Sequence, residues 1–185
     1  PGQRELSFCV HYSYDTQRSI LRDIVASLYR QGQRRLLIIN GHGGNNFKNM
    51  MRDLTLEYPD FIIATSEWFK MTDAHPFFDH VGDHADELET SVMMHYHPEL
   101  VSLSEAGQGD SRGFGIKALS EGKVWIPRNW AKVSRDTGIG SPAKATAEKG
   151  ARFAAAVVEK YVEFLADFAR VETIDDLYEP QFHNE

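Results

Sequence analysis

Residues 36–45 read Leu-Leu-Ile-Ile-Asn-Gly-His-Gly-Gly-Asn, an aliphatic run followed at once by a histidine among glycines. The run Leu36–Ile39 is typical of a buried strand. Open α/β sheets bind ligands at the carboxyl ends of their strands, so the place of His42 indicates a functional site. A plain glycine-rich turn with an exposed histidine is the alternative, since glycine clusters often mark turns alone.

Helical and strand patterns alternate on both sides of this stretch. Apolar residues recur at helical spacing from the capping candidates Asp15 and Thr16 to Gly32. After His42, a second helical pattern over residues 47–54 leads to another apolar run, residues 61–64. Strand, helix and strand in this order predict a βαβ unit with parallel strands, and therefore an α/β fold.

A second informative segment, residues 82–91, reads Gly-Asp-His-Ala-Asp-Glu-Leu-Glu-Thr-Ser. Acids in the first turn of a helix are favourable against its macrodipole, which accounts for the earlier carboxylates of this segment. It accounts less well for Glu89, which we expect a turn further in, next to apolar residues 92–94. A carboxylate there needs a partner, and a cation would provide one. We expect His84 in the loop before the helix, turning back toward it.

Together these segments resemble the creatininase (creatinine amidohydrolase) family of metal-dependent amide hydrolases. The resemblance runs through Asn40–Asn45, the His-Ala-x-Glu-x-Glu-Thr-Ser motif at His84–Ser91, and Thr137–Pro142 with Ala145–Gly150. It implies a single creatininase-like domain over residues 1–185, with a three-layer α/β/α fold and a mostly parallel sheet. It also implies one or two divalent metals per subunit, zinc first, with manganese or iron as alternatives.

The resemblance also implies roles for individual residues. His42 would be a metal ligand, Glu89 a carboxylate ligand of the same cation, and His84 the acid/base residue at the scissile amide. Gly43 and Gly44 would let the substrate approach the backbone closely. Creatinine-hydrolysing members often carry Tyr-Glu at these two positions, where the Glu ligates a second metal. Its absence here argues against creatinine itself as the substrate.

The implied reaction is metal-assisted hydrolysis of a small cyclic or formyl amide. The resemblance also implies a homo-oligomer, a hexamer. The family's opening Glu-x-His motif and its following Asp have no counterpart in Pro1–Ser13, where His11 and Asp15 are weak substitutes. A catalytic zinc normally takes three protein ligands. We therefore expect the domain to be N-terminally incomplete, with roughly 80 further residues upstream, a βαβ unit and more.

Composition agrees with a soluble globular enzyme but does little to identify it, and we expect the protein in the cytoplasm. With 185 residues, 25% charged and 42% hydrophobic, the chain suits one domain. Its net charge of −7 argues against a nucleic-acid partner, and no apolar run approaches the ~20 residues that span a membrane. The single Cys9 excludes an internal disulfide and suits a reducing cytosol. The expected partner is a small-molecule amide.

Two further regions allow expectations. The glycine-rich residues 103–140 carry Trp125 and Trp130, which either wall a pocket or pack against the core or a neighbouring subunit. Ser141 and Pro142 are suited to the N-cap and first position of a long helix. Its apolar stripe, Phe153, Val157, Tyr161, Phe164, Leu165 and Phe168, is expected to pack in the core.

Two other classes of function remain open. The first alternative is a non-catalytic subunit or fragment that keeps the motifs without a complete metal shell. A phosphate- or nucleotide-binding domain is the second alternative, but neither GxxxxGK[ST] nor GxGxxG spacing is present. The HExxH pattern is also absent, so His75 and His80 are interpreted as structural or incidental. Metal content and amidase activity separate the non-catalytic alternative from the enzyme, and titration with nucleotides tests the second alternative.

Overall fold

The computed structural model describes residues 3–179 of the chain. They form two compact units. The first, called here the strand unit, comprises Tyr12–Thr72 and the described chain from Val157 onward. The second, the loop unit, comprises the described residues up to His11 and Asp73–Ala156. Each unit has its own packing and is described in turn.

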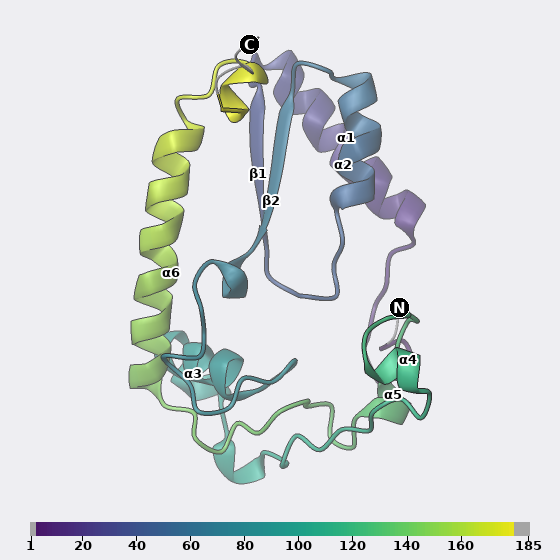
Figure 1. The fold of residues 1–185 in the computed structure, drawn as a ribbon, viewed down its shortest axis with the longest axis vertical. Coiled ribbons are helices and arrows are strands. Elements are labelled where there is room, and N and C mark those ends of the chain that lie inside the picture. Colours follow the sequence, from purple (N-terminus) through teal and green to yellow (C-terminus); the bar gives the residue numbers. More distant parts are fainter. Residues whose placement is uncertain (1–2, 180–185) are drawn as a thin grey trace, which may run out of the picture. The chain divides into compact units, whose positions relative to one another are not determined.

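The strand unit contains two parallel strands, β1 (Arg35–Asn40) and β2 (Ile62–Glu67). Their register runs from Arg35 opposite Ile62 to Asn40 opposite Glu67. The chain crosses from one strand to the other through α2 (Lys48–Glu57), as Figure 1 shows. The predicted βαβ unit with parallel strands is confirmed, and both strands end at the edge that carries the His42 turn.

The helix α1 (Tyr14–Arg30) precedes β1 and packs with α2 against the strands. Its N-cap is Ser13, which accepts a hydrogen bond from the backbone N–H of Thr16, so the helix begins before the predicted caps. It ends at Arg30, two residues before Gly32, where the sequence predicted the end and whose φ of 82° few other residues adopt. The buried core of this unit consists of Leu21, Val25, Met50, Leu54 and Phe61.

The C-terminal half of α6 (Ala147–Phe168) belongs to the strand unit as well. There the Tyr161 hydroxyl lies 2.7 Å from Ser66 Oγ of β2. Figure 1 shows α1 and α2 on one side of the two strands and this half of α6 on the other. Helix, sheet and helix thus form the three layers of the predicted α/β/α arrangement. Two short 3₁₀ helices, η1 (Trp68–Lys70) and η4 (Asp175–Leu177), complete the unit.

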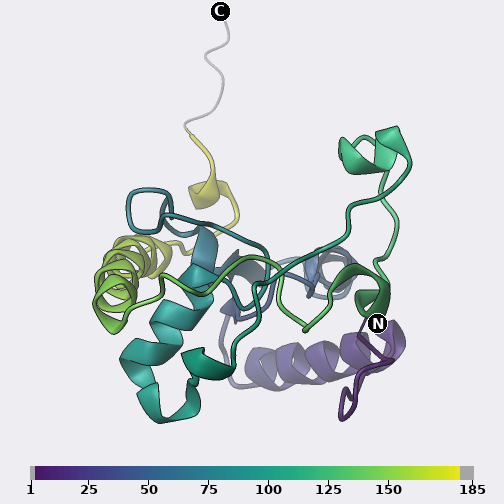
Figure 2. The ribbon, with the colours of Figure 1, turned by 90° about the horizontal axis from the view of Figure 1, so that it is seen from below.

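The loop unit is built around α3 (Glu87–Tyr96) and the N-terminal half of α6. Between them the chain forms only short helices, as the glycine content of residues 103–140 predicts. These are η2 (Pro98–Leu100), η3 (Leu103–Glu105), α4 (Lys117–Ser120) and α5 (Trp130–Val133). Figure 2 shows α4, in green, at the tip of an extended segment.

The long helix begins later than the sequence predicted. Ser141 and Pro142 do not open it; the chain turns here, with the Ala145 N–H donating to the Pro142 carbonyl at 2.9 Å. The cap is Thr146, whose hydroxyl accepts the N–H of Lys149 at 3.2 Å. The N–H of Thr146 itself donates to Ser91 Oγ at 3.1 Å. A contact with α3 therefore decides where α6 starts.

Gly150 allows α3 and α6 to approach each other closely. A Cβ atom placed there would lie 2.0 Å from the backbone oxygen of Ser91, far inside contact distance. We expect Gly150→Ala to lower the free energy of unfolding by about 1–3 kcal/mol, the usual cost of overpacking. Alanine would favour an isolated helix by roughly 1 kcal/mol, so the expected sign is opposite to helix propensity. Urea unfolding measures the change.

Gly113→Ala is the matched control, because a Cβ at that position meets nothing within 4 Å. Its stability should stay close to that of the parent. A stability gain in Gly150→Ala would mean that α3 and α6 are not held together at this point.

Candidate functional site

The strand-end turn is organised by Asn40, the buried last residue of β1. Its Oδ1 accepts hydrogen bonds from the His42 N–H at 3.2 Å and from Asn45 Nδ2 at 3.1 Å. Its Nδ2 donates to the His42 carbonyl at 2.9 Å. The amide side chain thus satisfies both ends of the turn and holds His42 at an exposed position beyond the strand. The sequence analysis did not assign this role to Asn40.

The His42 ring folds over its own turn. Its Nδ1 accepts the N–H of Gly44 at 3.1 Å, so the proton of the neutral ring lies on Nε2. A Cβ at Gly44 would lie 2.8 Å from His42 Cε1, and one at Gly43 would lie 3.3 Å from the Phe69 ring. The ring position therefore depends on glycine at residue 44.

His84 lies in the loop before α3, as predicted. Its N–H donates to the Ile139 carbonyl at 3.1 Å, and the Ile139 N–H donates back to the His84 carbonyl at 2.8 Å. The ring turns back toward the helix, where Nδ1 lies 3.8 Å from Glu89 Oε2. This bridge joins the second motif of the sequence to the third. The residue that follows, Ala85, has a φ of 49°, a left-handed conformation uncommon for a side chain other than glycine.

Glu89 is placed by the N-terminus of α3. The N-cap Asp86 accepts the Glu89 N–H at 2.9 Å, and Glu89 Oε2 in turn accepts the Ala85 N–H at 2.6 Å. This exchange resembles a capping box. The carboxylate therefore lies in the first turn and folds back over the helix start. The expectation that it enters the apolar region at 92–94 is wrong, because the cap offers it an N–H partner.

Glu87 is fully buried, with 0% of its surface exposed, and lies next to the buried N-cap Asp86. Its Oε1 accepts from Lys149 Nζ at 2.5 Å, and its Oε2 accepts the His80 N–H at 2.9 Å. Lys149 also donates to Asp79 at 2.8 Å. Sequence reasoning assigned Glu87 to the helix dipole and missed this network. The available signal was its spacing of four residues from Ser91, which is buried on the same face of α3.

These contacts set the protonation of Glu87. Burial alone would raise the pKa of its carboxyl, but hydrogen bonds from Lys149 and from the N–H groups of His80 and Asp79 outweigh it and lower the pKa. The same contacts, with Asp79 first, raise the pKa of Lys149. The folded protein therefore holds the pair in its charged form.

A pH dependence of stability follows. Because the pKa of Glu87 is lower in the folded state than in the unfolded chain, its contribution is present above the unfolded value, about 4.3. It is lost as the pH falls through the folded pKa. We expect Glu87→Gln to be less stable than the parent at pH 7, and the difference to shrink toward pH 3. Urea unfolding across this range measures it; a difference that does not change with pH would contradict the ion pair.

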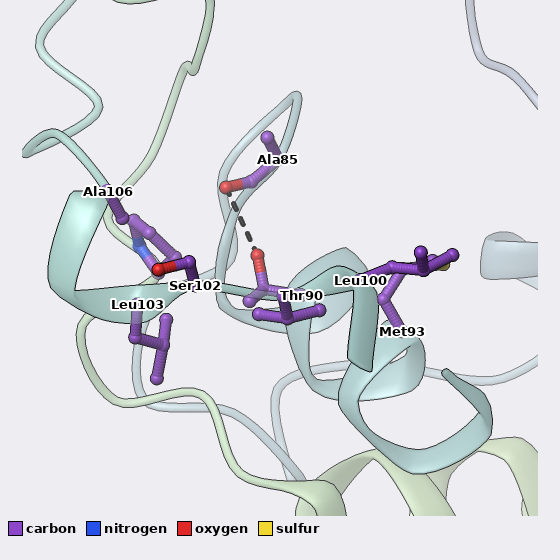
Figure 3. A pocket seen from close by; sticks show the side chains of 9 residues that line it. Ala85, Thr90, Met93, Leu100, Ser102, Leu103 and Ala106 are labelled. Atoms are coloured by element: carbon purple, nitrogen blue, oxygen red, sulfur yellow. Dashed lines mark hydrogen bonds between the residues drawn. The ribbon is translucent and has the colours of Figure 1, made fainter. Parts of the chain in front are cut away.

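A shallow apolar cavity of about 220 Å³ lies beside the His84–Glu89 turn (Figure 3). Ala85 and Thr90 line it, and the Thr90 hydroxyl donates to the Ala85 carbonyl at 3.4 Å. Its other walls come from η2, η3 and neighbouring residues, among them Met93, Leu100 and Leu103. Trp125 and Trp130 are not among the residues of this cavity.

The two tryptophans have different surroundings. Trp125 is 83% exposed, whereas Trp130 is 8% exposed and its ring centroid lies 5.2 Å from that of His84. Of the two alternatives in the sequence analysis, packing thus applies to Trp130. The side chain of Trp125 is open to solvent.

The donors that the sequence analysis assigned to a metal are of a suitable kind. Imidazole nitrogen and carboxylate oxygen are ligands of zinc, and carboxylates also suit manganese. Within residues 3–179, however, no three His, Cys, Asp or Glu side chains are grouped to hold an ion. Coordination through His42 Nε2 would require its proton to move and the Gly44 contact to open. His42 lies in the strand unit and Glu89 in the loop unit, so their shared cation stays a prediction.

The strand unit has an α/β fold with a histidine turn after β1, and the loop unit has a His84–Ile139 bridge before α3. The family model for creatininase, described as creatinine amidohydrolase, matches residues 2–165. The chain belongs to the creatininase family.

Individual relatives agree with this. The chain is 55% identical to a proposed creatinine amidohydrolase from Bacteroides fragilis NCTC 9343, with a TM-score of 0.90 over 97% of this chain and 70% of that one. It is 32% identical over 137 residues to the mycofactocin precursor peptide peptidase of Mycobacterium ulcerans (strain Agy99). That match covers 71% of this chain and 48% of the relative, so the chain spans about half of that protein's length.

More distant structures share the fold. A mutant creatininase of Zn-Zn type has a TM-score of 0.74 at 22% identity, over 90% of this chain and 69% of its own. A creatininase with Mn has a TM-score of 0.65 at 21% identity, over 88% and 67%. Zinc and manganese are thus the metals of these homologues. Among residues 3–179, none of the helices combines the length and apolar character that a membrane crossing requires.

Proposed function

We propose that this chain is a metal-dependent hydrolase of an amide C–N bond, with His84 as its acid/base residue and His42 and Glu89 as metal ligands. The proposal rests on the 3.8 Å approach of His84 Nδ1 to Glu89 Oε2 at the start of α3. The turn between them includes Ala85 in a left-handed conformation, a kind of strain that clusters at functional sites. Family membership supplies the reaction class.

Each residue has a defined task in this proposal. A divalent metal lowers the pKa of water toward ~7 and polarises a carbonyl. Glu89 Oε2 accepts the Ala85 N–H, so Oε1 would be the oxygen that holds the cation. The Ile139 bridge holds the backbone of His84 in the loop, and the His84 ring would deliver a proton to the departing nitrogen. The exposed backbone of Gly43 and Gly44 is the proposed substrate-binding surface.

The structure bears on the choice of substrate. One relative is named as a peptidase of a precursor peptide and another as a creatinine amidohydrolase. Both a peptide amide and a small amide are therefore candidate substrates. An acidic side chain at residue 44, as in creatinine-hydrolysing members, would displace the His42 ring, since even a Cβ there lies 2.8 Å from it. We therefore place a small cyclic or formyl amide other than creatinine first and a peptide amide second.

The test is a metal assay combined with a substrate panel. The protein is loaded with Zn²⁺ or Mn²⁺, its bound metal is measured by inorganic mass spectrometry, and it is incubated with creatinine, formamide and a short peptide. Hydrolysis of formamide or the peptide, dependent on metal, supports the proposal. Stoichiometric metal without hydrolysis of any of the three, or no bound metal at all, would favour a non-catalytic subunit instead. The lack of a three-residue metal group within residues 3–179 is the observation behind that alternative.

Assembly is part of the proposal. We infer a homo-oligomer, a hexamer as in the family. The exposed apolar side chains of Phe114, Ile116 and Val124 in the loop unit are compatible with subunit contacts. Light scattering at micromolar concentration measures the mass, and a monomer would contradict the inference.

A further inference from the structure

Trp130 is the first residue of α5, and a hydrogen bond from its indole N–H fixes its side chain. Its side chain is 8% exposed, and Nε1 donates to the Thr137 carbonyl at 2.9 Å. Buried indoles usually need such a partner for their N–H, and this one fixes the ring orientation. Thr137 belongs to the third motif of the sequence, the segment that also bridges His84 through Ile139.

The locked indole lies against the ring of His84. The two ring centroids are 5.2 Å apart and the ring planes meet at 88°, a T-shaped pair. This distance and angle fall within the favourable range for aromatic pairs, which contribute about 0.5–1.5 kcal/mol beyond buried area. The backbone of His84 is held by Ile139 and its ring by Trp130, so two separate contacts restrict the side chain.

Arg128 braces the indole from another direction. Its Cζ lies 4.9 Å from the centroid of the Trp130 ring, within the range of a cation–π contact. Its Nη1 also pairs with Asp83 Oδ2 at 2.5 Å. Asp83 precedes His84, and both of their N–H groups donate to the Ile139 carbonyl. Arg128 thus connects the loop before His84 with the ring that contacts it.

From this geometry we infer that Trp130 is a positioning residue for His84, with Arg128 as its brace. The consequence for catalysis rests on the proposed function, in which His84 transfers a proton. Nothing in the resemblance or in the relatives assigns this role to Trp130. The indole restricts the His84 ring to the orientation that faces Glu89, and proton transfer depends on that orientation.

The experiment compares Trp130→Leu, Trp130→Phe and Arg128→Met with Trp125→Leu in the full chain. Trp125 is the matched control because it is a tryptophan of the same unit with 83% exposure. Turnover and KM are measured on whichever of formamide and the short peptide is hydrolysed faster. Ring-proton resonances of His84 are recorded in ¹³C-histidine-labelled protein at one fixed pH and assigned by their absence in His84→Ala.

We expect Trp130→Leu to lower kcat by on the order of 10²-fold with little change in KM, as a small displacement of a reacting group does. Trp130→Phe keeps a ring beside His84 and should retain most of the turnover. The His84 resonances should shift in Trp130→Leu and stay unchanged in Trp125→Leu. If Trp130→Leu does not fold, the test uses Trp130→Phe, which is a smaller change, and Arg128→Met, which replaces a half-exposed side chain.

The outcomes separate the two proposals. Unchanged His84 resonances in a folded Trp130→Leu protein would overturn the positioning role, whatever the activity. Normal turnover in His84→Ala would overturn the proposed function while the resonances still decide whether Trp130 holds the ring. If neither amide is hydrolysed, the resonances alone decide the positioning role.

Discussion

Replacing His84 with alanine is expected to lower amide turnover by on the order of 10²–10⁴-fold, the usual contribution of acid/base catalysis. The ring is the proton donor in the proposed reaction, and its Nδ1 lies 3.8 Å from Glu89. Alanine keeps the backbone bridge to Ile139, since that bridge uses only main-chain atoms. Steady-state kinetics on the hydrolysed amide, together with metal content, measure the effect.

His75→Ala is the control for this variant. His75 lies in the same unit with its side chain 81% exposed and paired with Asp73 at 2.8 Å. It should keep its turnover and its metal. If His84→Ala loses bound metal together with activity, His84 belongs to the ligand set and the assignment of its role is wrong.

The second large effect concerns the metal. We expect His42→Ala and Glu89→Gln each to weaken metal binding by more than roughly 100-fold. Loss of a partner outside the ligand set typically costs 10–100-fold, so a larger loss distinguishes a ligand from its support. Competition with a zinc-binding dye measures the affinity. Glu99→Gln is the control, a 65% exposed carboxylate of the loop unit paired with His97.

A cation shared by His42 and Glu89 leads to a further expectation for the double variant. If both bind one ion, the double variant should lose less affinity than the sum of the two single losses, because either one already breaks the site. Additive losses would indicate separate ions. A metal-bound structure with the His42 and Glu89 side chains more than about 8 Å apart would also contradict the shared site, since metal–ligand bonds are about 2 Å.

Much of the local structure followed from the sequence because it depends on near neighbours. Apolar spacing predicted α1, α2 and the two strands, and Gly32 marked the end of α1. The place of His84 before α3 followed from the acids that cap that helix. The first residue of α6 did not, because Ser141 and Thr146 are both suitable caps and a contact with Ser91 selects the later one.

The candidate site divides in the same way. The motifs by themselves singled out His42, His84 and Glu89, since glycines beside a histidine and acids before an apolar run are visible in the chain. Only the tertiary structure showed that Glu89 folds back onto the Ala85 N–H at the start of α3 while Glu87 is buried. Two carboxylates in one helical turn look alike in sequence. Their surroundings differ because the packing of α6 on α3 brings Lys149, which is distant in sequence, to Glu87.

Trp130 is the clearest example of what the sequence left open. Two tryptophans in a glycine-rich segment, Trp125 and Trp130, gave no ground for choosing between them. The fold exposes the first and places the second against His84. Residue type and spacing determine which contacts a segment makes with itself, whereas contacts between distant segments depend on how the whole chain packs. The sequence therefore determined the fold class and singled out the candidate reactive residues, and the tertiary structure decided which side chains contact them.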